Sequence, residues 1–243
     1  MHWTDTGIIL SVRPHGETSA VVQVLTRERG RHAGLVRGAQ GKRLGGVYQP
    51  GNQVAVRWSG RLAEHLGNFD CELVEGYAAR VLDDPARLAT LTAAAAVSER
   101  ALPEREPHPA CYDGFLALLE ALSGDHWAEV YVRWELALLG ELGFGLDLSA
   151  CAGGGANDQL AYVSPRTGRA VSLAAGEPYR DRLLALPGFL AGRGGGGLAE
   201  VAQGLALTGF FLERHVFAPH HQAPPMARRR LAERFPAVPQ FGI

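Results

Sequence analysis

Cys151 is the first candidate in this sequence for a catalytic or metal-binding residue. It precedes three glycines in the stretch DLSACAGGGANDQLAYVSPRTGRAV, residues 147–171. A nucleophilic thiol needs a neighbouring base or positive field, and no signature of a cysteine hydrolase surrounds it. A structural zinc site needs four cysteine or histidine ligands. Residues 152–172 contain neither, so we predict no catalytic residue and no metal ligand here.

Two glycine runs and a histidine cluster are the other candidates for chemistry. GGGAND (153–158) and GRGGGG (192–197) lack the Gly-Lys-Ser/Thr ending of a phosphate-binding loop, which favours loops or flexible connectors over a nucleotide site. His215, His220 and His221 could bind a metal on one helix face, but Pro219 interrupts them, which favours a solvated helix end. We therefore expect no cofactor and no enzymatic activity. A thiol or nucleotide-dependent enzyme stays as a rival interpretation.

The basic side chains near the start of the chain indicate a different chemistry. The stretch TRERGRHAGLVRGAQGKR, residues 26–43, sets Arg27, Arg29 and Arg31 at alternate positions. On an extended backbone alternate side chains point to one face. Such a row suits phosphate backbones, because each neutralised phosphate releases counterions. A charged strand that is merely solvated is the alternative.

The charge distribution supports a polyanion partner for the first quarter of the chain. Residues 1–63 hold nine basic and three acidic side chains, a net charge of +6, whereas the whole chain carries −1. Drift could also produce such an asymmetry. Aromatic side chains for base stacking are scarce there: Trp58, Tyr48 and Phe69 are the candidates, and at least one is expected in the core. We therefore expect contacts to the nucleic-acid backbone and little base readout.

The elements that must position these residues change type along the chain. Five short strand-like runs, TGIILSV, SAVVQVLT, RHAGLVR, NQVAVRW and NFDCELVEG, occupy about residues 6–75. Five strands with a basic balance favour an oligonucleotide-binding (OB) barrel, with an SH3-like barrel as the alternative. We predict an OB domain over residues 1–78 and a mainly helical domain over residues 79–243, hence an α+β multidomain fold.

The helical domain is expected to begin after LDDP, where Asp83 or Asp84 can cap and Pro85 can open a helix. The period of apolar residues favours helices over 85–101, 112–122, 127–143, 178–186 and 198–217, and a short one that carries Arg228, Arg229, Arg230 and Arg234. No apolar run reaches 18 residues and no signal peptide is recognisable. Three widely spaced cysteines suit reduced thiols. A cytoplasmic protein without membrane insertion is expected.

Three stretches in this order resemble the bacterial recombination mediator family RecO. They are GETSAVVQVLTRERGRHAGLVRGAQ, YVRWELALLGELGFGLDLSAC and LAYVSPRTGRAVS, and the resemblance covers nearly the whole chain. It implies an OB barrel and a helical domain without catalytic turnover. It also implies binding of single- and double-stranded DNA, strand annealing, and help in loading the RecA recombinase. An OB-fold RNA-binding or translation-associated module is the alternative function.

The resemblance also implies partners and site residues. The implied partners are RecR, the C-terminal tail of single-stranded DNA-binding protein and, indirectly, RecA, with action at the nucleoid. Arg133 matches a family position implicated in gripping that tail, beside Trp134 and Leu138. A core-helix arginine that merely snorkels is the alternative. The DNA-facing candidates are Arg27, Arg29, Arg31, Arg37, Lys42, Arg43 and Arg57, with Arg13 as an extension.

One departure from the family pattern concerns Cys151. Many relatives carry a four-cysteine zinc module where this chain has residues 147–172, and here only the first cysteine remains. We interpret this segment as a degenerate, zinc-module-like hairpin insert held by packing and hairpin hydrogen bonds. No zinc is expected.

Overall fold

The computed structural model describes residues 1–39, 41, 45–154 and 157–235, which form two compact units. The first unit comprises Met1–Asp125 with Pro225–Arg228, and the second comprises His126–Pro224 with the described residues from Arg229 onward. From the sequence we expect a domain boundary after residue 78, where the strands give way to helices. That boundary stays a prediction.

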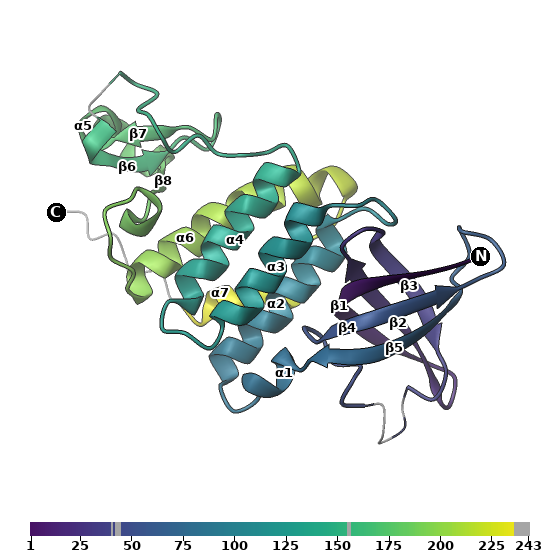
Figure 1. Cartoon of the computed structure of the whole chain (residues 1–243). Coiled ribbons are helices and arrows are strands. Elements are labelled where there is room, and N and C mark those ends of the chain that lie inside the picture. The colour runs from purple at the N-terminus through teal and green to yellow at the C-terminus, as the bar shows by residue number, and fades with distance from the viewer. Residues whose placement is uncertain (40, 42–44, 155–156, 236–243) are drawn as a thin grey trace. The chain divides into compact units, whose positions relative to one another are not determined.

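Five strands of the first unit close into a barrel in the order β1-β2-β3-β5-β4 (Figure 1). β1 pairs with β4 through its first half and with β2 through its second, and the register shifts between Ile9 and Ser11. Such a bulge bends a strand, as barrel closure requires. β3 and β5 meet in parallel at Leu35 and Asn68. The predicted five-stranded barrel is confirmed, with the strands β1 (His2–His15), β2 (Ser19–Thr26), β3 (Gly30–Val36), β4 (Gln53–Ser59) and β5 (Asn68–Glu75).

Alternation of apolar residues along the strands fills the barrel interior, as the period-2 pattern predicts. Val22, Val24 and Val54 are fully buried. Trp58 is 1% exposed, and its indole Nε1 donates to the carbonyl of Leu66 at 3.0 Å. That bond satisfies the single polar group of the ring inside an apolar core.

Three helices complete the described part of the first unit up to Asp125, namely α1 (Tyr77–Arg80), α2 (Pro85–Ala101) and α3 (Pro109–Ala121). The carboxylate of Asp84 accepts hydrogen bonds from Ala86 N at 2.9 Å and Arg87 N at 3.1 Å, and Pro85 occupies the first turn. These backbone hydrogen bonds lower the pKa of Asp84. The predicted cap and start of α2 are confirmed.

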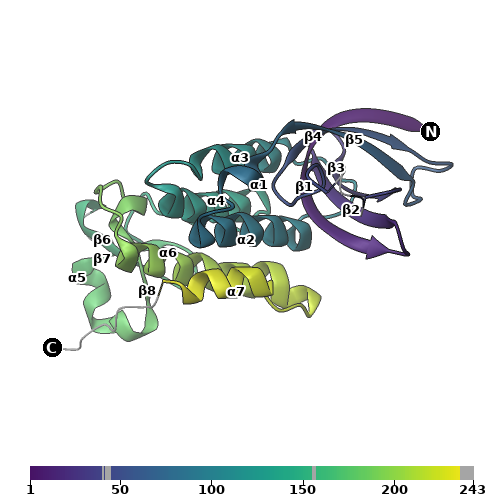
Figure 2. The ribbon, with the colours of Figure 1, turned by 90° about the horizontal axis from the view of Figure 1, so that it is seen from below.

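The second unit is built on α4 (Trp127–Glu141) and α6 (Leu198–Phe211), which lie side by side in Figure 1 and Figure 2. A buried polar group joins them. The Tyr131 hydroxyl donates to Glu135 Oε1 at 2.8 Å, and the Thr208 hydroxyl donates to the other oxygen of the same carboxylate. Glu135 is fully buried, and these bonds offset the loss of its hydration.

Two sequence predictions for the second unit are wrong in detail. The helix expected over 178–186 is a 3-10 helix, η2 (Glu177–Arg182), followed by a short strand, β8 (Leu184–Ala185), because that segment pairs with β6 (Leu160–Val163). The helix expected to Phe217 ends as α-helix at Phe211 and continues as a π-helical turn, η4 (Leu212–Phe217).

The hairpin predicted within residues 147–172 forms from β6 and β7 (Ala170–Ser172), and β8 extends it to a three-stranded sheet, β7-β6-β8. None of the helices in the described part of the chain could span a membrane. The remaining elements are η1 (Asn157–Gln159), α5 (Leu173–Gly176), η3 (Gly188–Leu190), η5 (Ala218–His220) and α7 (Met226–Glu233).

Candidate nucleic-acid interface

The turn between β2 and β3 carries two of the predicted DNA-facing arginines. Arg27 and Arg29 lie between Thr26 and Gly30, where the chain reverses, so the expectation of alternate side chains along a strand is wrong for them. Thr26 Oγ1 holds the turn, because it donates to the Gly30 carbonyl at 3.0 Å and accepts from Arg29 N at 3.1 Å. Gly30 has a φ of +69°, a conformation that favours glycine.

Arg27 is bound to acidic side chains of its own unit. Its Nε donates to Asp113 Oδ1 at 3.0 Å and its Nη2 donates to Asp113 Oδ2 at 3.1 Å. A third bond, at 2.8 Å, reaches Glu28. The hydrogen bonds to Asp113, and then to Glu28, raise the pKa of Arg27. A phosphate would have to displace Asp113 of α3 to gain this guanidinium.

Arg31, on β3, is the most enclosed of the predicted set. Its side chain is 14% exposed, and its Nε donates to the carbonyl of Leu102 at 2.9 Å. Its Nη1 donates to Gln23 at 3.1 Å and to Glu104 at 3.2 Å. This guanidinium fastens the connection between α2 and α3 to the outside of the barrel.

That connection covers part of the β2–β3 surface, the surface on which OB-folds bind oligonucleotides. The carbonyl of Arg31 accepts from Arg105 N at 2.8 Å. The Arg105 guanidinium donates at 2.7 Å to the carbonyl of Glu64, in the β4–β5 loop. Sequence reasoning missed Arg105 because it lies outside the strands, 74 residues after Arg31. Arg105 has a positive φ of 61°, which is rare for a residue other than glycine and which the sequence does not reveal.

Exposed arginines occur at several positions of the barrel. Arg29 and Arg37 are exposed, and within the described residues their guanidinium groups have no ion pair or hydrogen bond. They flank β3 (Gly30–Val36), one at each end of the strand. Arg57 is exposed and lies 3.5 Å from Asp70 on the neighbouring strand. Arg61, in the β4–β5 loop, is exposed and was counted but not assigned from sequence.

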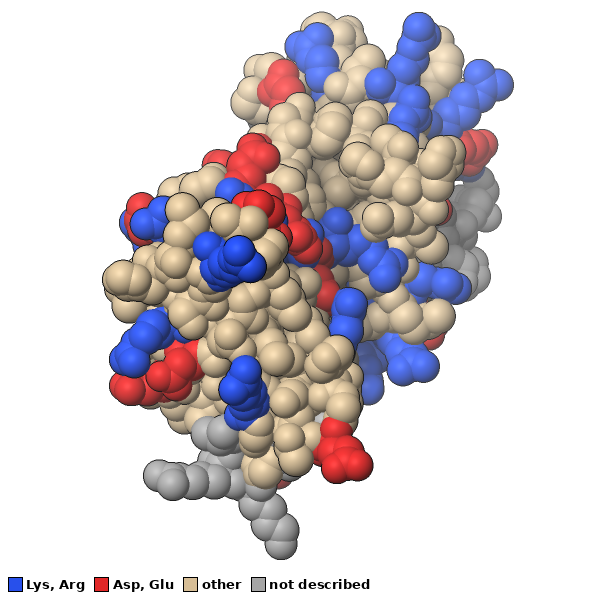
Figure 3. All heavy atoms as spheres, turned by 90° about the vertical axis from the view of Figure 1, so that its right-hand side faces the viewer, with Lys and Arg blue, Asp and Glu red and all other residues tan. Residues whose placement is uncertain are grey.

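Arg13 is exposed and ion-paired, as Arg57 is, because its guanidinium lies 2.6 Å from Glu99 of α2. Lys42 and Arg43 lie outside the described residues. Figure 3 shows basic and acidic side chains interspersed over the barrel, with no continuous basic band on that face.

The aromatic side chains considered for base stacking belong to the barrel core. Trp58, Phe69 and Tyr48 are 1%, 5% and 6% exposed. Trp3 stacks on Trp58 with ring centroids 5.8 Å apart, and the buried His32 ring lies 5.4 Å from Trp58. Desolvation lowers the pKa of His32, so the neutral ring is favoured there. The accessible groups of the barrel are therefore cationic rather than aromatic.

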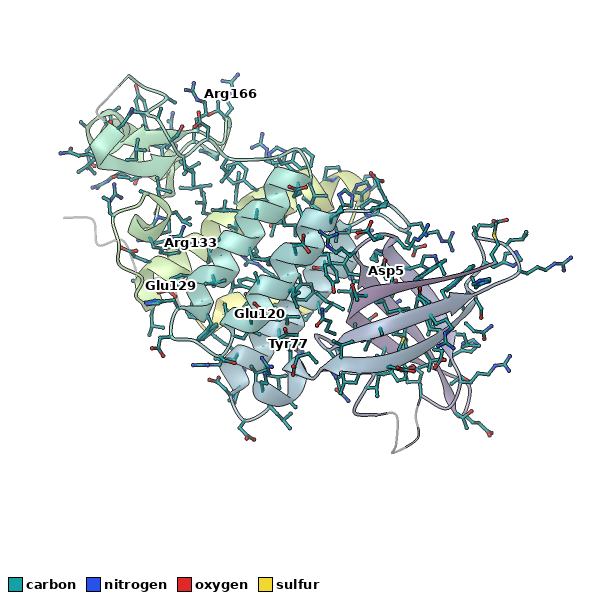
Figure 4. All side chains as sticks on the ribbon, in the orientation of Figure 1. Asp5, Tyr77, Glu120, Glu129, Arg133 and Arg166 are labelled. Atoms are coloured by element: carbon teal, nitrogen blue, oxygen red, sulfur yellow. The ribbon has the colours of Figure 1, made fainter. Side chains whose placement is uncertain are left out.

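Arg133, the predicted peptide-binding residue, lies on the exposed side of α4 (Figure 4). It donates to the carbonyl of Phe189, and its guanidinium carbon lies 5.5 Å from the centroid of the Phe189 ring. Trp134 and Leu138 are 6% and 3% exposed. From the sequence we expect Trp134 and Leu138 to offer a peptide an apolar surface beside Arg133. That expectation is wrong, because both side chains pack in the core of the second unit.

Cys151 is held inside the hairpin segment. Its sulfur accepts a hydrogen bond from Ser172 N at 3.2 Å, and its backbone N–H donates to Asn157 Oδ1 at 2.8 Å. Within the described residues no three histidine, cysteine or acidic side chains gather as metal ligands would. The residues present do not fit the zinc of a four-cysteine module.

Comparison with known proteins covers both units. The family model described as Recombination protein O N terminal matches residues 1–77, and the one described as Recombination protein O C terminal matches residues 82–224. The chain is 61% identical to DNA repair protein RecO of Rhodospirillum centenum over 237 residues, 97% of this chain and 95% of that protein. It is 50% identical to DNA repair protein RecO of Rhodospirillum rubrum over 242 residues, 96% of each chain.

A third relative, DNA repair protein RecO of Methylobacterium nodulans, is 51% identical over 235 residues, 94% of this chain and 95% of that protein. The two family models together match nearly every residue from 1 to 224, across the five-stranded barrel and the helical part that follows it. The chain therefore belongs to the RecO family and has a role in DNA repair.

Proposed function

We propose that this chain is a non-enzymatic mediator of recombinational repair that binds single- and double-stranded DNA through its barrel. The observation that carries the proposal is the set of exposed arginines around an OB-type barrel, in a chain that belongs to RecO. Guanidinium groups bind phosphate oxygens strongly. Contacts to phosphates rather than to base edges favour binding that depends little on sequence.

The barrel proposal is tested on its accessible arginines. Replacement of Arg29 and Arg37 by Ala should weaken binding to single strands and duplexes of any sequence, and should flatten the dependence of affinity on salt by about one unit per lost contact. The measurement is fluorescence anisotropy across a salt series. Replacement of Arg180 and Arg182, which removes the same charge from the second unit, is the control. An unchanged slope for the barrel variant would reject the assignment.

The finer activities are proposals that follow from the family. We propose that the chain anneals complementary strands, joins RecR, binds the tail of single-stranded DNA-binding protein, and helps to load RecA on strands coated with that protein. An annealing assay on coated strands, with and without the tail, measures this directly. Annealing that is insensitive to removal of the tail would contradict the tail contact. Because the proposed ligand is chromosomal DNA, we propose that the protein acts in the cytoplasm, at the nucleoid.

An RNA-binding or translation-associated function is distinguished in one titration. Contacts to phosphates alone give little preference between the two kinds of strand, because the distinguishing group of RNA is its 2′-hydroxyl. Competition between single-stranded DNA and RNA of equal sequence should therefore give affinities within about threefold. A strong preference for RNA would favour the alternative.

A further inference from the structure

A stack of three rings lies in the second unit, and none of its residues has been assigned a role so far. The His215 ring stacks on Phe144 with centroids 5.1 Å apart and an interplanar angle of 16°. It also stacks on Phe211, at 5.9 Å and 10°. Phe211 is buried, whereas Phe144 is 38% exposed. The exposed end of the stack therefore offers aromatic surface to a ligand.

Arginine side chains lie next to this stack. The Arg214 guanidinium carbon lies 5.9 Å from the centroid of the Phe210 ring, and its Nη1 donates to the carbonyl of Pro165 at 3.2 Å. Pro165 belongs to the turn between β6 and β7, which also carries Arg166 and Arg169. Figure 4 places Arg166 at the tip of that turn.

Acidic side chains neutralise only part of the positive charge of these arginines. Arg169 lies 3.4 Å from Asp147, so that pair is neutral. Glu213, next to Arg214, is exposed. Arg166 is exposed and has no ion pair within the described residues.

The elements that carry these groups are packed together within the second unit. Gly168 in the turn has a φ of +69°, and a Cβ there would lie 3.0 Å from Leu146 and 3.8 Å from Phe211. The backbone of Asp147 donates to the Gly168 carbonyl at 3.0 Å. His215 lies in the π-helical turn η4, a geometry that recurs at functional sites. The rings, the turn backbone and the Arg214 guanidinium are therefore held in place before any ligand binds.

We propose that Phe144, His215, Arg166 and Arg214 form a binding site for single-stranded nucleic acid on the second unit. An exposed ring accepts an unpaired base by stacking, and the arginines bind the flanking phosphates. A duplex presents no unpaired base to Phe144, and an acidic peptide makes no use of the stacked rings. The proposal rests on the proposed function only for the kind of ligand, because the site contains no residue of the barrel.

The site is tested first by photo-crosslinking of the full chain. Oligo-dT strands that carry one 5-iodo-deoxyuridine are irradiated with the protein, and adducts are mapped by mass spectrometry. Adducts on Phe144 or His215 are expected. Adducts confined to residues 1–77 would overturn the second site and leave the barrel assignment intact. Adducts at neither place would also overturn the second site, whereas the barrel assignment, which rests on phosphate contacts, is decided by the salt titration of the Arg29 and Arg37 variant. A duplex that carries the same base should crosslink poorly at Phe144, and equal crosslinking would contradict base stacking there.

Variants give the second test, by anisotropy with oligo-dT. Phe144→Leu keeps an apolar side chain but removes the ring, so it should weaken binding about fivefold, the effect of one lost base stack. Arg166→Ala should weaken binding by a similar factor and flatten the salt slope. Arg182→Ala, an exposed arginine of the same unit, should change neither. Full affinity of both Phe144→Leu and Arg166→Ala would overturn the proposal. So would loss of the Phe144 crosslink when a poly-glutamate peptide is added, because the site would then bind an acidic peptide in place of the strand.

Discussion

Individual arginines of the barrel differ in what a phosphate would have to displace. Arg27 makes two bonds to Asp113 and one to Glu28, and Arg31 makes three bonds that fasten the α2–α3 connection. Arg29 and Arg37 make no such bonds within the described residues. At the scale of residues, the same side-chain type therefore serves structure at some positions and is open to a ligand at others.

Asp113→Asn tests this distinction. Loss of the carboxylate charge should release Arg27 for phosphate, so DNA affinity should rise about twofold to tenfold at low salt and the salt dependence should steepen. An exposed ion pair contributes about 0–1 kcal/mol, so the fold should tolerate the change. The measurement is anisotropy over a salt series. Asp125→Asn removes the same charge elsewhere in the first unit, and an equal gain from it would mean that only net charge matters.

At the scale of elements, the β2–β3 turn is tied to the connection between α2 and α3. Gly30 has a φ of +69°, and a Cβ there would meet the carbonyl oxygen of Glu106 at 2.0 Å. Gly16, in the turn between β1 and β2, has a similar φ of +67°, but a Cβ there would have no heavy atom within 4 Å. The two glycines share a backbone conformation and differ in surroundings.

This pair separates backbone strain from close contact. Gly16→Ala should cost about 1–2 kcal/mol of unfolding free energy, the penalty of left-handed backbone. Gly30→Ala should cost about 1–3 kcal/mol more, because the connection must shift. Urea unfolding followed by circular dichroism measures both. Equal destabilisation by the two substitutions would show that Gly30 does not lie as close to the α2–α3 connection as the distance to Glu106 indicates.

At the scale of the whole molecule, we expect the tail peptide to bind at Arg133, an exposed residue that belongs to neither proposed DNA site. Arg133→Ala should lower affinity for a tail peptide of single-stranded DNA-binding protein about tenfold, because a charge-assisted bond contributes roughly 1.5–3 kcal/mol. Binding of naked DNA should be unchanged. Calorimetry with the peptide and anisotropy with DNA provide the two measurements, and Arg182→Ala is the matched control. Equal loss for both ligands, or loss for neither, would contradict the separation.

Local sequence patterns were enough for most of the fold. Short β-branched or alternating apolar runs marked all five barrel strands, and the cap at Asp84 marked the start of α2, because both signals involve residues that are neighbours in the chain. The helix expected over 178–186 failed because β8 pairs with β6, a contact between segments about 20 residues apart. Strand pairing of that kind overrides local preference.

By itself, the sequence determined the five barrel strands and the change to helices after them, the basic first quarter and membership of the RecO family, since motifs and periodicity are properties of neighbouring residues. Only the tertiary structure decided which arginines are engaged and which are accessible, that Trp134 is buried, and that Phe144, Phe211 and His215 form one stack. The physical reason is distance along the chain. Arg27 meets an acid 86 residues away and Phe144 meets a ring 71 residues away, and no local pattern encodes such encounters.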